Sequence, residues 1–332
     1  MMHNVGKNMA VVAWLAVMAG CGGSSMEEPM KPQADLVPVI ISANTEAMTR
    51  ADGTFVNSVF TSGKQMGVFG YAYSSATWQS SSLPNFFNNQ PMTLEDSGST
   101  SGLTYSPVAY WPSEGRKLAA FGYYPYSGDA SNIVPNVSSG LGTFTYTTPL
   151  AASDQTDFMV TPLVTDKTSS DNPLNLTLYH TLACIEISVD LSGTEFSSIS
   201  SAKVLNVRTK GMFNPTVFND DINNYNDDWR TTAWITESEV EDVNIDKLPA
   251  SGSLTVTDET RLLLIPQQCY PSLHRIELTL VRSADGSTVT TSYGLTEKWK
   301  AGNVYQYNIT GVTLSNPGLL GNAGGAIDGG IK

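Results

Sequence analysis

The stretch LAAFGYY, residues 118–124, alternates from one residue to the next and is typical of a β-strand. The same alternation recurs at residues 67–71, 174–179, 275–281 and 304–309. Polar clusters rich in Gly, Ser and Asp separate these runs and supply the residues that turns use. We therefore expect an all-β fold of β-sandwiches.

A helical pattern is nearly absent from the chain. No window of 15 residues keeps a 3.6-residue period, and the acidic stretch Glu237–Lys247 is the best candidate for a short helix. We expect any helix to be a minor element of the fold.

Length and polar segments predict two domains. The chain has 332 residues, and a globular domain usually holds about 100–200. The polar segment SSDNP at residues 169–173 is the natural boundary. The expected organisation is residues 1–20 as a signal peptide, 21–35 as a lipidated linker, 36–173 and 174–314 as β-sandwich domains, and 315–332 as a Gly-rich tail.

The charge of the chain argues against nucleic-acid binding. There are 31 acidic and 18 basic residues, which gives a formal net charge of −13, and no stretch is strongly basic. Nucleic-acid-binding proteins need a basic surface that faces the phosphates. The hydrophobic content of 41% is too high for a disordered chain. We expect a folded, acidic protein with no nucleic-acid partner.

Residues suited to catalysis or metal binding are sparse. The chain has three His and three Cys, with no CxxC pair and no GxSxG, HExxH or P-loop motif. His180 and His274 lie in strand-like runs, where a structural imidazole is usual. The oxygen-rich run 220–228 lacks the glycine and terminal glutamate of an EF-hand, so we interpret it as a solvated loop rather than a calcium site. We expect no enzymatic activity, no cofactor and no metal site.

Residues 1–20 have the features of a secretory signal peptide. His3 and Lys7 form a weakly basic start, and residues 9–19 (MAVVAWLAVMA) form an apolar run. A membrane-spanning helix needs about 20 apolar residues, so this shorter run is expected to be a signal and not an anchor.

The end of this run resembles a bacterial lipobox. Residues 17–21 read VMAGC, with Met18 where Leu is preferred. We expect Cys21 to be lipidated, since two or three acyl chains hold a protein on a membrane. Residues 21–35 would then form a polar tether. The alternative is an ordinary signal peptide that happens to end in a cysteine.

Cys184 and Cys269 are the other two cysteines. Cys184 lies in the strand-like run 182–189, on the face that also carries Glu186. An exported protein can form disulfides, but the sequence does not show that these two cysteines approach each other. We expect free thiols, with a disulfide as the alternative.

Seven short motifs follow one another along the chain. They are TRA at 49–51, GKQMGVF at 63–69, YSPVAYWP at 105–112, LAAFGYYPY at 118–126, DFM at 157–159, LYHTLA at 178–183 and WKAGNVY at 299–305. In this order and spacing, over most of residues 37–312, they resemble the fimbrillin and fimbrillin-like lipoproteins of Bacteroidales.

The resemblance implies two transthyretin-like β-sandwiches in tandem. It further implies an outer-membrane lipoprotein precursor, cleavage by an arginine-specific protease, and assembly with other pilus subunits into a cell-surface fimbria that supports adhesion. Two features depart from the family pattern: Cys184 replaces a basic residue, and the tail from Pro317 is long and Gly-rich. Whether the chain is a stalk, tip or anchor subunit therefore stays open.

Polymerisation by donor-strand exchange needs a strand that can leave. The segment LVPVIISA at residues 36–43 is the expected strand, with Val37, Val39, Ile40 and Ile41 as its apolar residues. Its loss would expose unpaired backbone groups beside an apolar groove. A strand from another subunit can add to such an edge.

The expected cleavage lies between Arg50 and Ala51. Arg50 is the first arginine of the chain and lies in the polar stretch NTEAMTRADG, residues 44–53, which we expect to be an exposed loop. The alternative is that Arg50 is an ordinary solvated basic residue.

The expected donor segment lies near the C-terminus. Its best-placed apolar residues are Val312, Leu314, Leu319 and Leu320. The alternative is a tail without a partner, because its glycines raise the entropy lost on docking.

A rival hypothesis rests on tryptophans in polar surroundings. Trp78, Trp229 and Trp234 could stack on sugar rings, which would make the chain a non-polymerising surface lipoprotein or a pilus-tip adhesin that binds a host glycan or protein. Core packing is the commoner role of a Trp in a β-sandwich.

Overall fold

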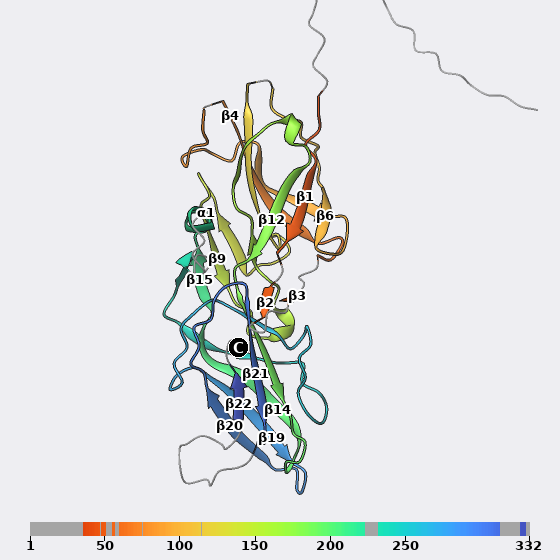
Figure 1. Cartoon of the computed structure of the whole chain (residues 1–332), viewed down its shortest axis with the longest axis vertical. Helices are drawn as coiled ribbons and strands as arrows, with labels where there is room; N and C mark the ends of the chain where they lie inside the picture. Colours follow the sequence, from red (N-terminus) through yellow and green to blue (C-terminus); the bar gives the residue numbers. More distant parts are fainter. Residues whose placement is uncertain are drawn as a thin grey trace, which may run out of the picture. The chain divides into compact units, whose positions relative to one another are not determined.

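The structure is a computed structural model that describes residues 36–46, 48–50, 55–56, 60–74, 76–113, 115–222, 232–312 and 326–329. Nearly all regular structure in these ranges is β, which confirms the expected fold class (Figure 1). The exceptions are the helix α1 (Pro215–Ile222) and the 3-10 turns η1 (Ala152–Asp154) and η2 (Ser169–Asp171).

The first sheet has eight strands and closes on itself. In spatial order they are β10 (Met159–Val160), β12 (Leu174–His180), β1 (Ile41–Thr45), β6 (Thr100–Thr104), β5 (Phe87–Leu94), β4 (Gln65–Tyr73), β7 (Lys117–Tyr124) and β11 (Val164–Lys167). Because β10 also pairs with β7, the strands from β10 to β7 form a closed ring of pairings.

Strands β4 and β7 are buried on both faces, so they carry the most apolar runs of the sheet. One face, with Val68 and Ala120, belongs to a core that also contains Val39 and Ile41. The opposite face supplies Phe121 and other aromatic residues to a second core. This double burial explains why the stretch 118–124 has almost no polar side chain.

A small sheet covers the aromatic core and joins the two halves of the chain. Its strands, in order, are β16 (Trp234–Thr236), β15 (Lys210–Phe213), β9 (Thr143–Thr147) and β8 (Ile133–Asn136). Phe144 of β9 lies opposite Phe213 of β15, although 69 positions separate them in the sequence. The aromatic core is therefore shared between the two halves.

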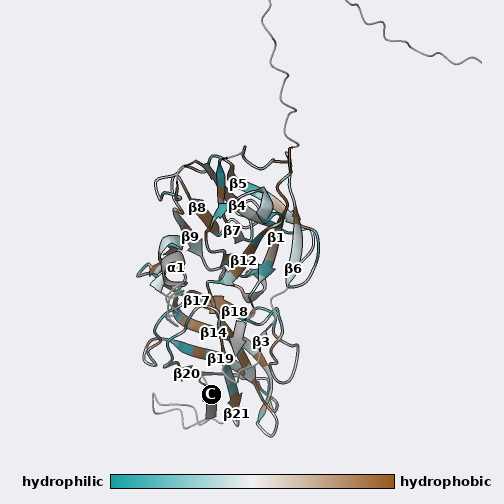
Figure 2. Ribbon diagram, turned by 45° about the horizontal axis from the view of Figure 1, so that its top comes forward, coloured by the Kyte–Doolittle hydropathy of each residue, from teal (hydrophilic) through white to brown (hydrophobic). Residues whose placement is uncertain are grey.

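Two further sheets enclose the third core. One contains β18 (Leu262–Leu264), β13 (Ala183–Val189), β21 (Asn303–Thr310), β2 (Met48–Arg50) and β3 (Phe55–Val56), with β22 (Ala326–Gly329) also paired to β21. The other contains β17 (Val240–Asn244), β14 (Phe196–Arg208), β19 (Arg275–Arg282) and β20 (Thr288–Gly294). Figure 2 shows hydrophobic segments on the strands that line the cores.

The expected domain boundary at residues 169–173 differs from the strand pairing. Strand β12 begins at Leu174 and completes the first sheet between β10 and β1. A division that follows the pairings would come after His180. The polar residues 169–173 are not a linker, because residues 169–171 form the turn η2 and only Asn172 and Pro173 separate it from β12.

The expected helix at Glu237–Lys247 is wrong. This stretch contains strand β17, which pairs antiparallel with β14. Val243 is buried, while the charged residues Glu241 and Asp242 are at least partly exposed. The polar composition of the stretch is therefore explained by a strand at the edge of its sheet, with many side chains in solvent.

Cys184 and Cys269 are both buried thiols, and no disulfide joins them. The expected alternation in β13 is confirmed, because Ile185 and Ile187 pack in the third core while Cys184 packs with Val304 on the other face of the strand. Burial raises the pKa of the Cys269 thiol to about 12, which keeps it protonated and unreactive at neutral pH.

A buried ion pair lies on the same outer face of β13. The Glu186 side chain is 1% exposed, and Arg261 Nε donates to its Oε1 at 2.8 Å. Gln306 Nε2 donates to the other oxygen at 2.8 Å. These contacts compensate the cost of burying the carboxylate.

The variant Arg261→Ala removes the cation beside a buried carboxylate. We expect it to lower the free energy of unfolding by about 3–5 kcal/mol, measured by urea denaturation. The matched control is Lys210→Ala, which breaks the exposed Lys210–Glu239 pair and should cost at most about 1 kcal/mol. Equal losses in the two variants would contradict the structural role of the Glu186–Arg261 pair.

Candidate functional site

Strand β1 is an interior strand of the first sheet. It pairs parallel with β12, with Ile41 opposite Leu174, and antiparallel with β6, with Ile41 also opposite Leu103 (Figure 1). Its N–H and C=O groups are therefore satisfied on both sides. We call the position that residues 37–45 occupy between these neighbours the slot.

Side chains of the slot segment alternate between the core and solvent. Val39, Ile41 and Ala43 are at most 3% exposed and belong to the core of the first sheet. Val37 and Ile40 are 39% and 54% exposed. Of the four apolar residues expected in the departing strand, Val39 and Ile41 face inward and Ile40 faces outward, whereas Val37, two positions before Val39, is exposed at the start of the segment.

The backbone contacts of the slot continue beyond β1. Val39 N–H donates to the Ala109 carbonyl and Trp111 N–H to the Val37 carbonyl, both at 2.9 Å. On the β12 side, Leu174 N–H donates to the Ile40 carbonyl at 2.8 Å. The slot thus holds nine residues, about 30 Å of extended chain.

Two side chains also bind the backbone of the slot segment. The Asn172 carboxamide accepts from Ile40 N–H at 2.8 Å through Oδ1 and donates from Nδ2 to the Pro38 carbonyl at 3.0 Å. The Tyr105 hydroxyl donates to the Val39 carbonyl at 2.7 Å. Burial raises the pKa of Tyr105, so its hydroxyl keeps the proton that it donates.

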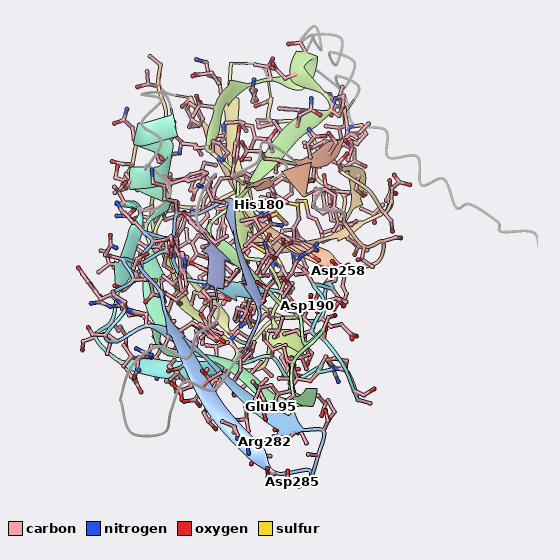
Figure 3. All side chains as sticks on the ribbon, turned by 60° about the horizontal axis from the view of Figure 1, so that its bottom comes forward. His180, Asp190, Glu195, Asp258, Arg282 and Asp285 are labelled. Carbon is pink, nitrogen blue, oxygen red and sulfur yellow. The ribbon has the colours of Figure 1, made fainter. Side chains whose placement is uncertain are left out.

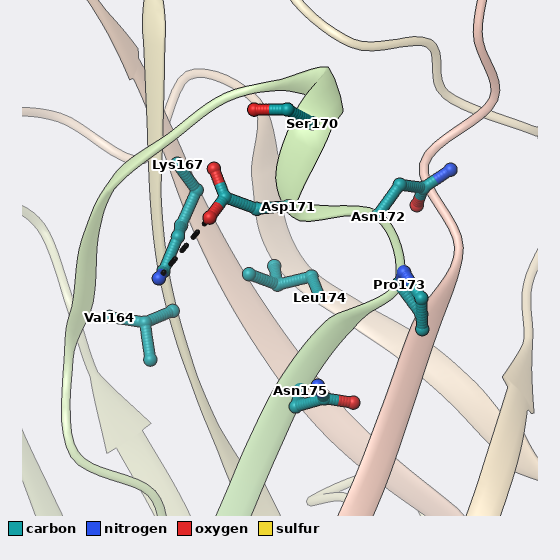
Figure 4. A pocket seen from close by; sticks show the side chains of 8 residues that line it. All are labelled: Val164, Lys167, Ser170, Asp171, Asn172, Pro173, Leu174 and Asn175. Carbon is teal, nitrogen blue, oxygen red and sulfur yellow. Dashed lines mark ion pairs between the residues drawn. The ribbon is translucent and has the colours of Figure 1, made fainter.

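Asn172 borders a hollow of about 400 Å³ at the end of the slot (Figure 4). Its lining includes Lys167, Asp171, Leu174 and Asn175. The Lys167 ammonium lies 3.7 Å from the Asp171 carboxylate. The hollow therefore lies beside the slot, in the turn that carries Asn172.

A buried histidine holds the far end of the slot segment. The His180 side chain, labelled in Figure 3, is fully buried. Its Nδ1 contacts Asp157, and its Nε2 donates to the Glu46 carbonyl at 2.8 Å. Glu46 directly follows β1. Both ring nitrogens of His180 thus have partners, as expected for a structural imidazole. Through the bond from Nε2, His180 connects β12 to the segment between β1 and β2.

Arg50 lies at the end of a strand, not in the exposed loop expected from the sequence. It is the last residue of β2, where it pairs with Val304 of β21. The next positions, including Ala51, fall outside the described residues. The segment from β1 to Arg50 therefore contributes strands to two different sheets.

Strand β21 is the meeting point of both terminal segments. Its residues Asn303 and Val304 pair with β2, and Tyr307–Thr310 pair antiparallel with β22. Val312 is 2% exposed and packs in its own core, so its side chain is not available for donation without local unfolding. The other expected donor residues, Leu314, Leu319 and Leu320, fall outside the described residues, as does Cys21.

The tryptophans proposed to bind sugars have different environments. Trp234 is 8% exposed, and its indole N–H donates to the Thr181 carbonyl at 2.7 Å, so it is a core residue and that assignment is corrected. Trp78 is partly exposed and packs edge-on against Tyr71. Trp229 falls outside the described residues.

No helix in the described ranges is long and apolar enough to cross a membrane. The described residues also contain no group of three or more His, Cys, Asp or Glu side chains placed to hold a metal ion. Most of the oxygen-rich run 220–228 lies outside these ranges.

A profile of fimbrillin-like proteins matches residues 49–321. The chain belongs to the fimbrillin-like family. This membership confirms the resemblance inferred from the seven motifs and supports a structural role in cell-surface fimbriae. The matched range includes Arg50, the Asn172 turn and β21.

The sequence of one relative matches part of the chain. The fimbrium subunit Fim1C of Phocaeicola vulgatus is 29% identical over 123 residues, which is 36% of this chain. The match spans 31% of that relative's length, less than a third.

Solved structures show the same fold. A fimbrial protein from Bacteroides vulgatus aligns with a TM-score of 0.55 at 17% identity, over 82% of this chain and 94% of that one. A Bacteroides ovatus protein proposed to act in cell adhesion also gives 0.55, at 18% identity, over 89% and 96% of the two chains. At these identities the likeness shows the fold alone.

Adjacent isoleucines test the orientation of the slot segment. Ile41→Ala should lower the free energy of unfolding by about 2–5 kcal/mol, because it leaves a cavity in the core. Ile40→Ala should change it by at most about 0.5 kcal/mol, because that side chain is largely exposed. Urea denaturation of both variants measures the difference, and equal effects would show that the segment does not occupy the slot in this register.

Proposed function

We propose that this chain is a fimbrial subunit that polymerises by exchanging the strand in its slot. It is exported as a precursor lipidated on Cys21 and held at the outer membrane. An arginine-specific protease cuts between Arg50 and Ala51, residues up to 50 leave, and an extended segment of another pilus subunit enters. The product is a cell-surface fimbria.

The observation that carries this proposal is the interior position of β1. The strand is bonded on both sides and lies on the N-terminal side of Arg50. Its removal would open two unpaired edges, on β12 and on β6, above the core that Val39 and Ile41 now fill. Unpaired edges beside an apolar groove favour addition of a strand.

The strength of such a joint follows from the contacts that the slot offers. Each inward aliphatic side chain contributes about 1.5–3 kcal/mol on burial. Each backbone hydrogen bond adds about 0.5–1.5 kcal/mol net. With contacts distributed over nine residues, a strand in the slot should dissociate slowly even after association costs.

Release requires two sheets to give up a strand. Strand β2 must leave β21 and β3, and β1 must leave β12 and β6. Because β2 has only three residues, its local opening should cost little and expose Arg50 to a protease. The longer, buried β1 should stay in place until another strand replaces it.

Limited proteolysis of the folded chain tests the proposal. An arginine-specific protease should remove residues up to Arg50, and the cut protein should form oligomers on size-exclusion chromatography. The matched variant Arg50→Lys should keep its N-terminal segment and stay monomeric under the same treatment. Permanently monomeric cut protein, or oligomers formed equally by the variant, would contradict strand exchange after Arg50.

A further inference from the structure

The backbone ladder between the slot and β12 ends at Leu174. Its N–H donates to the Ile40 carbonyl. In a continued parallel ladder the Ile40 N–H would bind the backbone carbonyl of residue 172. It binds the Asn172 side-chain oxygen instead, and the same carboxamide donates to the Pro38 carbonyl.

The opposite side of the slot has a similar arrangement. The register of β1 and β6 would place Val39 opposite Tyr105 if the ladder continued. The Tyr105 hydroxyl, rather than its backbone, binds the Val39 carbonyl. Side chains therefore bind three consecutive residues, 38–40, just before β1, in addition to the backbone bonds of Val39 with Ala109 and of Ile40 with Leu174.

The turn that carries Asn172 has hydrogen bonds of its own. The preceding turn closes through Asp171 N–H to the Thr168 carbonyl at 2.9 Å and Thr168 N–H to the Asp171 carboxylate at 2.8 Å. The Thr168 N–H bond holds the pKa of Asp171 below its usual value. These contacts do not involve residues 37–45, so the turn should persist when the slot segment leaves.

We propose that Asn172 and Tyr105 form a side-chain clamp that sets the register of whichever strand occupies the slot. This inference rests on the proposed strand exchange. The clamp binds only backbone atoms, so it accepts many sequences, but it requires an N–H at the position of Ile40. It tolerates proline at the position of Pro38, where only the carbonyl is used.

The C-terminal tail contains a segment that meets these requirements. Residues 317–320, PGLL, match residues 38–41, PVII, in the order proline, any residue, aliphatic, aliphatic. In this register Leu319 presents its N–H to Asn172, and Leu320 takes the inward position of Ile41. The occupant that we assign to the slot is therefore the segment from Pro317 of a second copy.

Peptides with a single backbone change test the clamp. The protein is cleaved after Arg50, freed of its N-terminal segment, and titrated with a peptide of residues 36–45. A second peptide carries an ester in place of the amide between Val39 and Ile40, which removes the Ile40 N–H. A third carries the ester between Ile41 and Ser42, whose N–H also faces β12 by strand alternation.

Wild-type protein should bind the Ile40 ester about fivefold to tenfold more weakly than the amide peptide, the effect of one hydrogen bond. In Asn172→Ala this difference should fall below about twofold, while the Ser42 ester keeps its penalty. The matched control Asn175→Ala should behave as wild type, because Asn175 contacts the side chain of Ser42 and not the backbone. An Ile40 ester penalty that is as large in Asn172→Ala as in wild type overturns the clamp.

A peptide of residues 315–325 tests the assigned occupant. It should bind the freed protein, and an ester that removes the Leu319 N–H should weaken binding about fivefold to tenfold in wild type but not in Asn172→Ala. Binding without that dependence overturns the register.

Hydrogen exchange in the uncleaved chain tests the clamp without strand exchange. The Ile40 amide should exchange at least about fivefold faster in Asn172→Ala than in wild type or Asn175→Ala. Tyr105→Phe, which removes one hydroxyl, provides a second variant that is expected to fold and to loosen residues 38–40. If the freed protein binds no peptide but the Ile40 amide exchanges faster in Asn172→Ala, the proposed function fails and the clamp stands. If amide exchange is unchanged in both Asn172→Ala and Tyr105→Phe, the clamp is overturned.

Discussion

The first sheet depends on strand β1, which lies between two strands that do not pair with each other. Strand β1 pairs with β12 on one side and β6 on the other, and these pairings close the ring of strands around the first core. Val39 and Ile41 fill that core. If β1 left, both the ring and the core would be incomplete, so the position must be occupied for the sheet to remain stable.

Contacts around the slot divide into two kinds. In the middle, backbone ladders and inward apolar side chains provide most of the binding energy. At the ends, side chains bind the backbone of the segment: Asn172 and Tyr105 at residues 38–40, and His180 at Glu46. This arrangement is what the proposed strand exchange needs, because a second sequence would enter the slot in the same register.

The all-β fold could be predicted because it rests on local alternation, and the apolar run at residues 36–43 indicated a strand, which the structure places at Ile41–Thr45. In the run LVPVIISA the sequence indicated a strand, but it could not separate Val39 from Ile40, because both neighbours of each are apolar. The inward face was decided by pairing with β6 and β12, which are distant in the sequence. The prediction for Trp234 is wrong for a similar reason: the polar residues of the wider stretch 230–239 do not reveal that its side chain packs in the aromatic core.

Two polar segments have structures that their composition does not indicate. Residues 169–173 have the composition of a linker, yet they form the turn that positions Asn172 beside the slot. Residues 237–247 carry helix-forming charges, yet pairing with β14 makes their centre a strand.

The N-terminal residue of the protein recovered from native fimbriae tests the central claim most directly. The account predicts Ala51, because the chain should enter the polymer only after its own slot segment has left. Polymerised protein that begins at Cys21, or anywhere before Ile41, would keep its own strand in the slot and would contradict the account.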